Sequence, residues 1–214
     1  AVIEIAAIVR EPFRSRFTLR SRDRVIGEFT VNVPGEHNVL NATAAVAVAL
    51  ELGQEPGRIR AALEAFRGVD RRFQIRGQAA GVTVVDDYGH HPTEIKATLD
   101  TARGCGYRKV HVLFQPHRYT RTRLLMDEFA GAFHQADHVY VTEIYAASEP
   151  PIEGVTGTQL AERMRAFGHR SVEFVGTLAG GVQAVAANVR EGDLVVTLGA
   201  GSISQAGDLI LSAL

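Results

Sequence analysis

The feature that most restricts the fold is an alternation of apolar runs and helix-like segments from residue 82 onward. The apolar runs are short and rich in β-branched residues, as buried strands are. Strands that alternate with helices predict a parallel sheet with helices on both faces, and right-handed crossovers make this a Rossmann-like α/β fold. The predicted strands are residues 82–86, 109–114, 138–142, 172–174 and 193–198, and the predicted helices are residues 93–103, 120–134, 157–167, 177–189 and 204–213.

The preceding part of the chain has a different pattern. Residues 1–33 have β-type composition, with strands predicted at 2–9, 16–21 and 25–33 and a hairpin turn near Asp23. The run Ala42–Leu52 is apolar on nearly every side, which predicts a buried helix that ends near Gly53. A second helix is predicted at 56–66, and residues 72–79 pair with 82–86 in a hairpin. The break at 68–70 predicts a domain boundary, with domains 1–69 and 70–214.

Composition excludes several classes of protein. The 214 residues are 46% hydrophobic and 22% charged, which is typical of a soluble globular chain. A formal net charge of −1 provides no overall field for nucleic acid or an anionic membrane, and no apolar run could span a bilayer. The single Cys105 excludes an internal disulfide and fits a reducing compartment. The chain starts at Ala1 without Met or signal peptide, so we expect a fragment.

Chemically active side chains follow the predicted strand at Val82–Val85. Asp86 and Asp87 come where the strand should end, and the helix after them opens with a proline at its first turn. Open α/β sheets bind ligands at the carboxyl ends of their strands, which makes this loop a candidate site. The alternative is that the carboxylates serve a turn or cap the helix, and that the histidines are solvated or structurally bonded. The remaining candidate residues of the loop are Tyr88, His90 and His91.

A basic segment follows the next predicted strand, which ends at Phe114. Arg118 and Arg121 are three residues apart, so at a helix start they can point the same way. Two guanidinium groups beside a helix N-terminus favour an anion such as a carboxylate or phosphate. If the strands are neighbours, this segment lies close to the loop at 86–91. The alternative is a solvated basic helix start.

Two smaller groups precede these loops. His37, Asn38 and Asn41 come at a helix start, where asparagine either caps the helix or reads the edge of a base with paired amides. Arg71 and Arg72 lie at the inferred domain junction, where they are either solvated or bind a phosphate.

Other ligand-binding motifs are weak or absent. Gly199-Ala200-Gly201 lacks the third glycine of a dinucleotide fingerprint, so we interpret it as a tight strand-to-helix turn that lets backbone approach neighbouring loops. The sequence contains neither a Gly-x-x-x-x-Gly-Lys-Ser/Thr phosphate loop nor a convincing metal cluster.

The chain closely resembles the Mur ligases, which build the peptide of bacterial cell-wall precursors. The resemblance runs along the whole chain, in the family's order, through the stretches at 35–41, 71–73, 86–94, 114–122 and 198–201. It implies that residues 1–69 are the C-terminal portion of the central ATP-binding domain and that 70–214 are the Rossmann-like C-terminal domain. The partner of this chain is then the missing N-terminal part of the same enzyme.

The resemblance also implies a reaction in the bacterial cytoplasm. It is strongest to the members that use ATP to join L-alanine to UDP-N-acetylmuramate through an acyl phosphate, with Mg²⁺ held by the missing part. Because residues 1–214 lack the phosphate loop, we expect no ligase activity from them alone. The implied ATP contacts are His37, Asn38, Asn41, Arg72 and Asp87, and the implied alanine and acyl-phosphate contacts are Tyr88, His90, Arg118 and Arg121, of which His90, Arg118 and Arg121 are catalytic.

Two alternatives remain. The ligase that recycles murein tripeptide has a similar Asp-Asp-x-x-His-His-Pro stretch, although the segment from Pro116 to Arg121 argues against it. A chain of this length could also be a non-catalytic module that binds a nucleotide or a partner.

Overall fold

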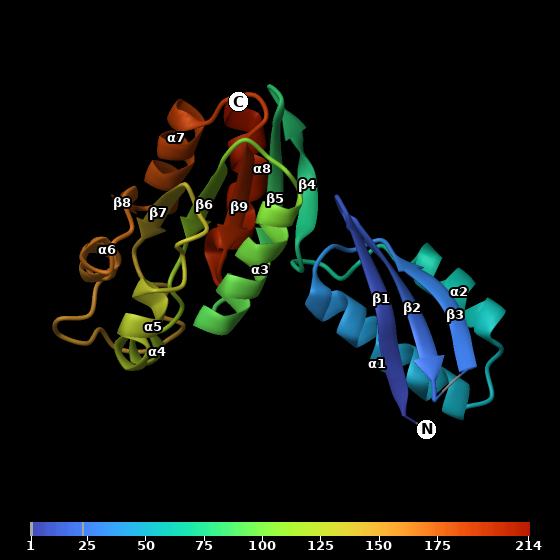
Figure 1. Cartoon of the computed structure of the whole chain (residues 1–214). Coiled ribbons are helices and arrows are strands. Elements are labelled where there is room, and N and C mark those ends of the chain that lie inside the picture. Colours follow the sequence, from blue (N-terminus) through green and yellow to red (C-terminus); the bar gives the residue numbers. More distant parts are fainter. Residues whose placement is uncertain (1, 23) are drawn as a thin grey trace. The chain divides into compact units, whose positions relative to one another are not determined.

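The computed structural model describes residues 2–22 and 24–214, so Ala1 and the turn predicted at Asp23 lie outside the described residues. The chain divides into two compact units (Figure 1). The N-terminal unit comprises residues 1–69 with 104–106, and the C-terminal unit comprises residues 70–103 and 107–214. Each unit is described by itself.

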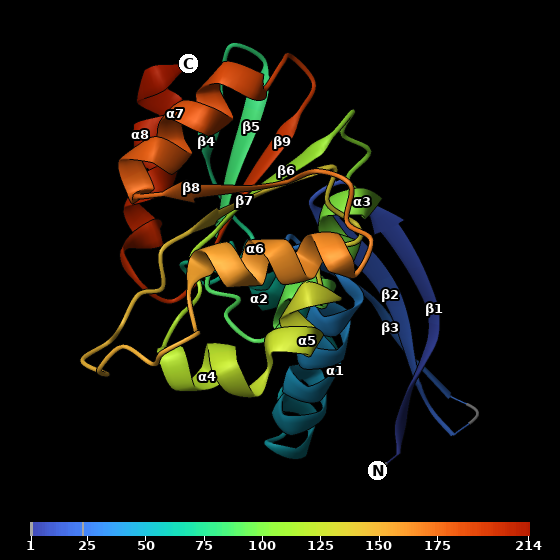
Figure 2. The same ribbon diagram turned by 90° about the vertical axis from the view of Figure 1, so that its left-hand side faces the viewer.

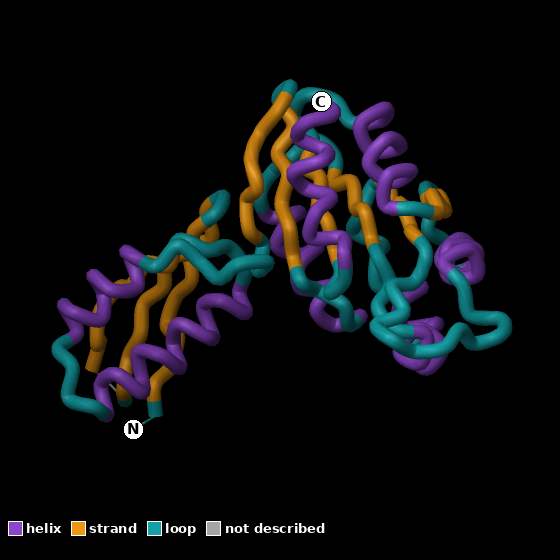
Figure 3. Tube along the Cα trace, turned by 180° about the vertical axis from the view of Figure 1, so that it is seen from behind, coloured by secondary structure: helices purple, strands orange, loops and turns teal. Residues whose placement is uncertain are grey.

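The N-terminal unit has a three-stranded antiparallel sheet in the order β1-β2-β3. Its strands are β1 (Ile3–Glu11), β2 (Arg14–Ser21) and β3 (Arg24–Val31), which confirms the β-rich prediction. Helices α1 (Glu36–Glu51) and α2 (Pro56–Ala65) lie on one face of the sheet (Figure 3). The core between the sheet and the helices consists of Phe17, Leu19, Phe29, Val31, Val33, Val39, Ala42, Val46 and Ile59.

The prediction of a helix buried on all sides is wrong for α1. Only Val39, Ala42 and Val46 are buried in this helix, whereas Val48 is 60% exposed. The reason is that the sheet covers a single face of α1. An open groove of about 640 Å³ lies along α1 and β3, with the exposed Val48 and Val25 among the residues that line it.

The C-terminal unit is built on a six-stranded sheet in the order β4-β5-β9-β6-β7-β8. The first strand, β4 (Gln74–Ala79), is antiparallel to β5 (Val82–Asp87), and all other pairs are parallel. This arrangement confirms the predicted hairpin and the mostly parallel sheet. The other strands are β6 (Val110–Phe114), β7 (His138–Thr142), β8 (Val172–Gly176) and β9 (Leu194–Leu198).

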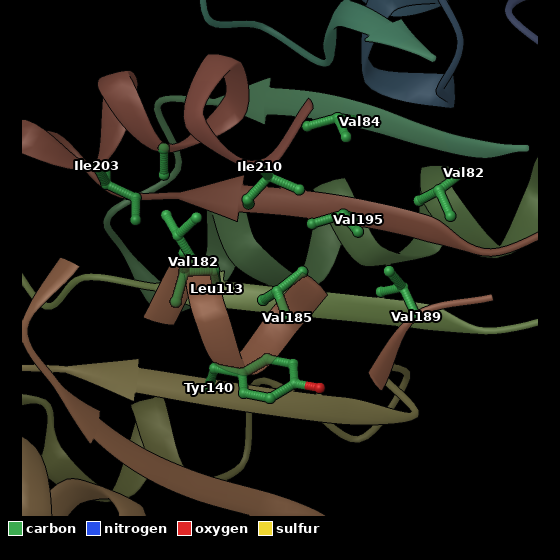
Figure 4. Packing of buried hydrophobic residues seen from close by; sticks show 11 residues of the cluster. Val82, Val84, Leu113, Tyr140, Val182, Val185, Val189, Val195, Ile203 and Ile210 are labelled. Atoms are coloured by element: carbon green, nitrogen blue, oxygen red, sulfur yellow. The ribbon is translucent and has the colours of Figure 1, made fainter. Parts of the chain in front are cut away.

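Helices cover both faces of this sheet, as the alternating pattern predicted (Figure 2). On one face, α7 (Leu178–Asn188) and α8 (Ala206–Ala213) pack on side chains of β5, β6, β7 and β9 (Figure 4). On the other face lie α3 (Pro92–Gly104), α5 (Met126–Ala130) and α6 (Gly157–Ala166). The helix predicted at 120–134 is instead two short ones, α4 (Tyr119–Leu124) and α5, separated at Leu125. A 3₁₀ turn at Ser202–Gln205 precedes α8.

The condition that β5 and β6 are neighbours is not met, because β9 lies between them. In the register of the sheet, Asp87 of β5 and Phe114 of β6 both pair with Leu198 of β9. The three strands therefore end at the same level, and the turn that starts at Gly199 lies between the other two loops. A buried apolar strand such as β9 can pair with any other buried strand of a parallel sheet. Its place in the order of the strands therefore cannot be predicted from its own sequence.

Buried and half-buried titratable side chains lie near the opposite, amino end of the sheet. His138 stacks on Tyr140 with ring centroids 4.2 Å apart, and His111 lies 6.0 Å from His138. Burial, and then the charge of His111, lowers the pKa of His138 to about 4. Burial also lowers the pKa of His111, although Asp193 opposes it from 3.3 Å. Both imidazoles are therefore neutral in the folded protein at pH 7.

We expect the free energy of unfolding to fall as the pH is lowered from about 6.5 to about 4. Within this window the unfolded state protonates His138 and the folded state does not, so acid favours unfolding. The contribution of His138 is on the order of 2 kcal/mol, and urea unfolding followed by circular dichroism at several pH values measures it. His138→Gln should flatten the pH dependence, whereas His91→Gln, at an exposed position, should leave it unchanged. If the free energy of unfolding of His138→Gln depends on pH as steeply as that of the parent, His138 is not the group that causes this dependence.

Candidate functional site

The loops after β5, β6 and β7 meet through a row of four aromatic rings, Tyr88, His90, His117 and Tyr145, hereafter the aromatic row. The ring centroids of Tyr88 and His90 are 5.0 Å apart, and those of His90 and His117 are 5.9 Å apart, both edge to face. His117 and Tyr145 stack at 5.6 Å with an interplanar angle of 11°. The predicted proximity of the 86–91 loop and the basic segment is therefore confirmed, although β9 separates their strands.

Asp86 is buried at the end of β5, where it binds two side chains beneath the aromatic row. Its carboxylate accepts hydrogen bonds from Arg71 Nε at 2.8 Å and from Thr197 Oγ1 at 2.7 Å. Arg71 also donates to the carbonyl of Gly199 at 2.6 Å, and its guanidinium lies 5.0 Å from the centre of the Tyr88 ring. Arg71 thus connects the end of β5, the turn after β9 and the aromatic row.

Asp87 shapes the next loop with both of its oxygens. One accepts from the backbone N–H of Phe73 at 2.8 Å and the other from that of Gly89 at 2.7 Å. Burial raises the pKa of the Asp87 carboxyl, and these two hydrogen bonds together with Arg72 oppose that rise. Asp87 is 6% exposed, and the side chain of Thr98 is a further hydrogen-bond partner of its carboxylate.

His90 is oriented by the start of α3. Its backbone N–H donates to Glu94 Oε2 at 3.0 Å, and its Nδ1 lies 2.9 Å from the carbonyl oxygen of Tyr88. Because a carbonyl can only accept, Nδ1 carries a proton and the neutral ring keeps Nε2 as its acceptor. A histidine held in this way can accept a proton at Nε2.

Arg118 stands at the N-cap of α4 with φ 73°. Its backbone N–H donates to the carbonyl of Tyr145 at 2.9 Å, and its half-exposed guanidinium lies 3.9 Å from Glu149 Oε1. Glu149 in turn accepts from the N–H and hydroxyl of Thr120 at 3.0 and 2.6 Å, which lowers the pKa of its carboxyl. The Arg118 guanidinium therefore lies beside a carboxylate that Thr120 holds in place.

Arg121 lies one helical turn from His117 and contacts it twice. Its NH1 is 3.2 Å from His117 Nδ1 and 3.3 Å from the His117 carbonyl oxygen. Burial lowers the pKa of His117, and the charges of Arg121, His90 and Arg118 lower it further. Arg118 and Arg121 thus both bring positive charge to the aromatic row, which makes this end of the site suited to an anion.

The turn after β9 passes close beneath the loops, and its glycines allow this approach. A Cβ at Gly199 would come within 2.6 Å of the Gln115 carbonyl oxygen, and one at Gly201 within 2.6 Å of the Tyr145 ring. Gln115 holds the turn, since its Oε1 accepts from the N–H of Ile203 at 3.0 Å. The prediction of a tight turn with close backbone approach is confirmed.

A family model described as "Mur ligase, glutamate ligase domain" matches residues 71–201, which include all of these loops. The chain belongs to the Mur ligase family.

Individual Mur ligases are similar along the whole chain. The UDP-N-acetylmuramate–L-alanine ligase of Solibacter usitatus is 63% identical over 214 residues, which are 100% of this chain and 45% of that protein. The crystal structure of UDP-N-acetylmuramate–alanine ligase from Thermotoga maritima has a TM-score of 0.84 at 30% identity, covering 98% of this chain and 45% of that one. A murein peptide ligase from Psychrobacter arcticus has a TM-score of 0.64 at 25% identity, covering 99% and 44%. The chain thus spans less than half the length of these relatives.

The predicted nucleotide residues of this Mur ligase are divided between the two units. Asn38 lies in the first turn of α1, where Gly35 is the N-cap, and its side-chain Nδ2 donates to the carbonyl of Pro34 at 2.6 Å. His37 and Asn41 are exposed on the same helix. In the C-terminal unit, Arg72 is exposed and lies 6.0 Å from the centre of the Tyr88 ring. Their contacts with ATP remain predictions.

The sequence predicts that the loop at 86–91 and the basic segment lie close together, but several residues that connect the loops are not singled out by it. Arg71 was considered only as part of an arginine pair, and neither Gln115 nor Glu149 was assigned a function. His117 lies within the stretch 114–122 and Tyr145 follows the strand predicted at 138–142, but only the contact between their rings reveals them. The available signal was their position directly after predicted strands.

Within residues 2–22 and 24–214, no group of three or more His, Cys, Asp or Glu side chains is arranged to hold a metal ion. In the same residues, every helix is too short or too polar to cross a membrane.

Proposed function

We propose that this chain is part of a bacterial cytoplasmic ligase that uses ATP to join L-alanine to UDP-N-acetylmuramate in the synthesis of peptidoglycan precursors. The observation that carries the proposal is the 63% identity, over the whole chain, to a relative named for that reaction. The site at the carboxyl ends of the strands supports the proposal. Arg118 and Arg121 lie there beside His90 and His117, where they could bind the carboxylate of a small amino acid. Because the chain spans less than half of its relatives, the complete enzyme is the object of the proposal.

The reaction has two steps. The γ-phosphoryl group of ATP is transferred to the carboxylate of UDP-N-acetylmuramate, which gives an acyl phosphate and ADP. The amine of alanine then forms a bond to the acyl carbon while the carbon–oxygen bond to phosphate breaks. The amine gives up a proton, and inorganic phosphate leaves.

The side chains of the aromatic row and its arginines suit the second step. We assign the alanine carboxylate to Arg118 and Arg121, whose guanidinium groups can bind it with two hydrogen bonds each. His90, with a proton on Nδ1, is positioned to take the amine proton at Nε2. Tyr88 would contact the bound alanine next to His90, since the two ring centroids are 5.0 Å apart.

We assign the nucleotide to the residues that the family resemblance names. Asn38 and Asn41, with His37 beside them, would contact adenine, Arg72 the phosphates and Asp87 the ribose. Residues 1–69 would then be the C-terminal portion of the ATP-binding domain and 70–214 the amino-acid-binding domain. Mg²⁺ would be held by the part of the enzyme outside this chain, and the same part would cover the exposed apolar face of α1.

A murein peptide ligase is the second candidate, because a structure of that activity shares the fold over 99% of this chain. The lower TM-score of 0.64, against 0.84 for the alanine ligase, favours the alanine ligase. The segment from Pro116 to Arg121 favours it as well.

The test is ADP release by the full-length protein that contains this chain. We expect release to require ATP, UDP-N-acetylmuramate and L-alanine together, and residues 1–214 alone to stay at background. Replacing alanine with the murein tripeptide should abolish turnover. Turnover with tripeptide but not alanine would favour the recycling ligase, and no turnover with either would contradict ligase function.

A further inference from the structure

We propose that His117 is a positioning residue that aims Arg121 at the carboxylate of the amino-acid substrate. The proposal rests on the proposed function, but it concerns a residue to which neither the family motif nor the comparisons assign a role. It follows from the contacts of one ring and is argued from three observations.

The first observation is the contact between Arg121 and the imidazole. Arg121 NH1 lies 3.2 Å from His117 Nδ1 and 3.3 Å from the His117 carbonyl oxygen. A guanidinium nitrogen can only donate, so Nδ1 must be an unprotonated acceptor. His117 is therefore neutral with its proton on Nε2, and one residue supplies two acceptors that hold the same guanidinium nitrogen. Arg121 keeps its other nitrogens for a ligand.

The second observation is that the imidazole itself cannot turn freely. Tyr145 stacks on it at 5.6 Å, nearly parallel, and His90 lies against it at 5.9 Å. The two loops are also joined by backbone, because Tyr145 N–H donates to the Pro116 carbonyl at 2.8 Å. The turn at Gly201 contacts the Tyr145 ring. A rigid ring of this kind can fix the direction of a long, flexible arginine side chain.

The third observation is the charge that surrounds the ring. Burial disfavours the imidazolium most, and Arg121 of α4, His90 of the loop after β5 and Arg118 at the N-cap of α4 disfavour it further, whereas Glu149 favours it. The neutral form that the hydrogen bond requires is thus also the form that the surrounding charges prefer.

These contacts separate the functions of the two histidines. His90 has its proton on Nδ1, bonded to Tyr88, and offers Nε2 as an acceptor. His117 has the opposite tautomer and offers Nε2–H as a donor, so it is not suited to take the amine proton. His117 acts through Arg121, and the proton transfer is left to His90.

The kinetic test uses the full-length enzyme with His117→Ala and His117→Asn. Alanine at 117 removes the side-chain acceptor, so we expect the KM for L-alanine to rise about tenfold while the KM for ATP changes less than about twofold. Asparagine places an amide oxygen near the Nδ1 position and should restore most of the loss. A His117→Ala enzyme with an unchanged KM for alanine would overturn the proposal, as would one in which both KM values rise equally.

The second test needs no turnover and uses the present chain. Nitrogen NMR of the imidazoles at pH 7 should show His117 with Nδ1 unprotonated and Nε2 protonated, and Arg121→Met should raise the pKa of His117. A protonated Nδ1 would overturn the proposal. Because this measurement uses the unsubstituted chain, it holds even if the His117→Ala variant does not fold. If the parent enzyme shows no alanine-dependent ADP release, the proposed function fails, whereas an active parent with the wrong tautomer rejects only the role of His117.

Discussion

Replacing Asp86 with alanine is expected to lower the free energy of unfolding of the C-terminal unit by about 3–5 kcal/mol. The Asp86 side chain is 1% exposed and that of its partner Arg71 is 22% exposed, so removing the carboxylate leaves a largely buried guanidinium without its counter-charge. The hydroxyl of Thr197, which is fully buried, loses its 2.7 Å bond to the carboxylate and keeps only the Val85 carbonyl oxygen, 3.4 Å away. Urea unfolding of the chain, followed by circular dichroism, measures the loss.

A surface pair provides the matched control for this experiment. Asp127 and Arg163 form an equally short ion pair at 2.7 Å, but their side chains are 57% and 47% exposed. Asp127→Ala should therefore change the free energy of unfolding far less than Asp86→Ala, because solvent screens an exposed ion pair. If Asp86→Ala is as mild as Asp127→Ala, Arg71 and Asp86 do not hold the end of β5 as we infer.

Replacing Arg121 or Arg118 with alanine in the full-length enzyme is expected to raise the KM for L-alanine roughly ten- to a hundredfold. A hydrogen bond between a guanidinium and a carboxylate contributes about 1.5–3 kcal/mol, which corresponds to that range. The KM for ATP should stay nearly unchanged, because the nucleotide is assigned to other residues. Lysine at either position should rescue little, since a point charge cannot make the two-pronged contact.

Arg123 is the control within the same helix. It is an exposed arginine of α4, outside the contacts that surround the aromatic row. Arg123→Ala should therefore leave both KM values near those of the parent enzyme, which is measured by varying alanine and ATP separately. A rise in the KM for ATP without a rise for alanine in Arg118→Ala or Arg121→Ala would assign these arginines to the nucleotide instead.

Much of the fold was predictable from local pattern. The β-branched run at Val82–Val85 and the apolar runs that follow predicted buried strands, and all of them are strands. The helical spacing between them predicted the helices, with the one error near Leu125. Because ligands gather at the carboxyl ends of parallel strands, the same pattern also indicated which loops would meet.

The sequence by itself therefore determined the types of the elements, the mostly parallel sheet and the edge at which the polar loops gather. The tertiary structure decided that β9 lies between β5 and β6, that Arg71 bonds Asp86, and that His117 lies between His90 and Tyr145. It also decided that the sheet of the N-terminal unit covers only one face of α1. The physical reason is that periodicity reports which face of an element is buried, through neighbours a few residues away. The choice of partner depends on contacts between residues far apart in the chain, which no local pattern encodes.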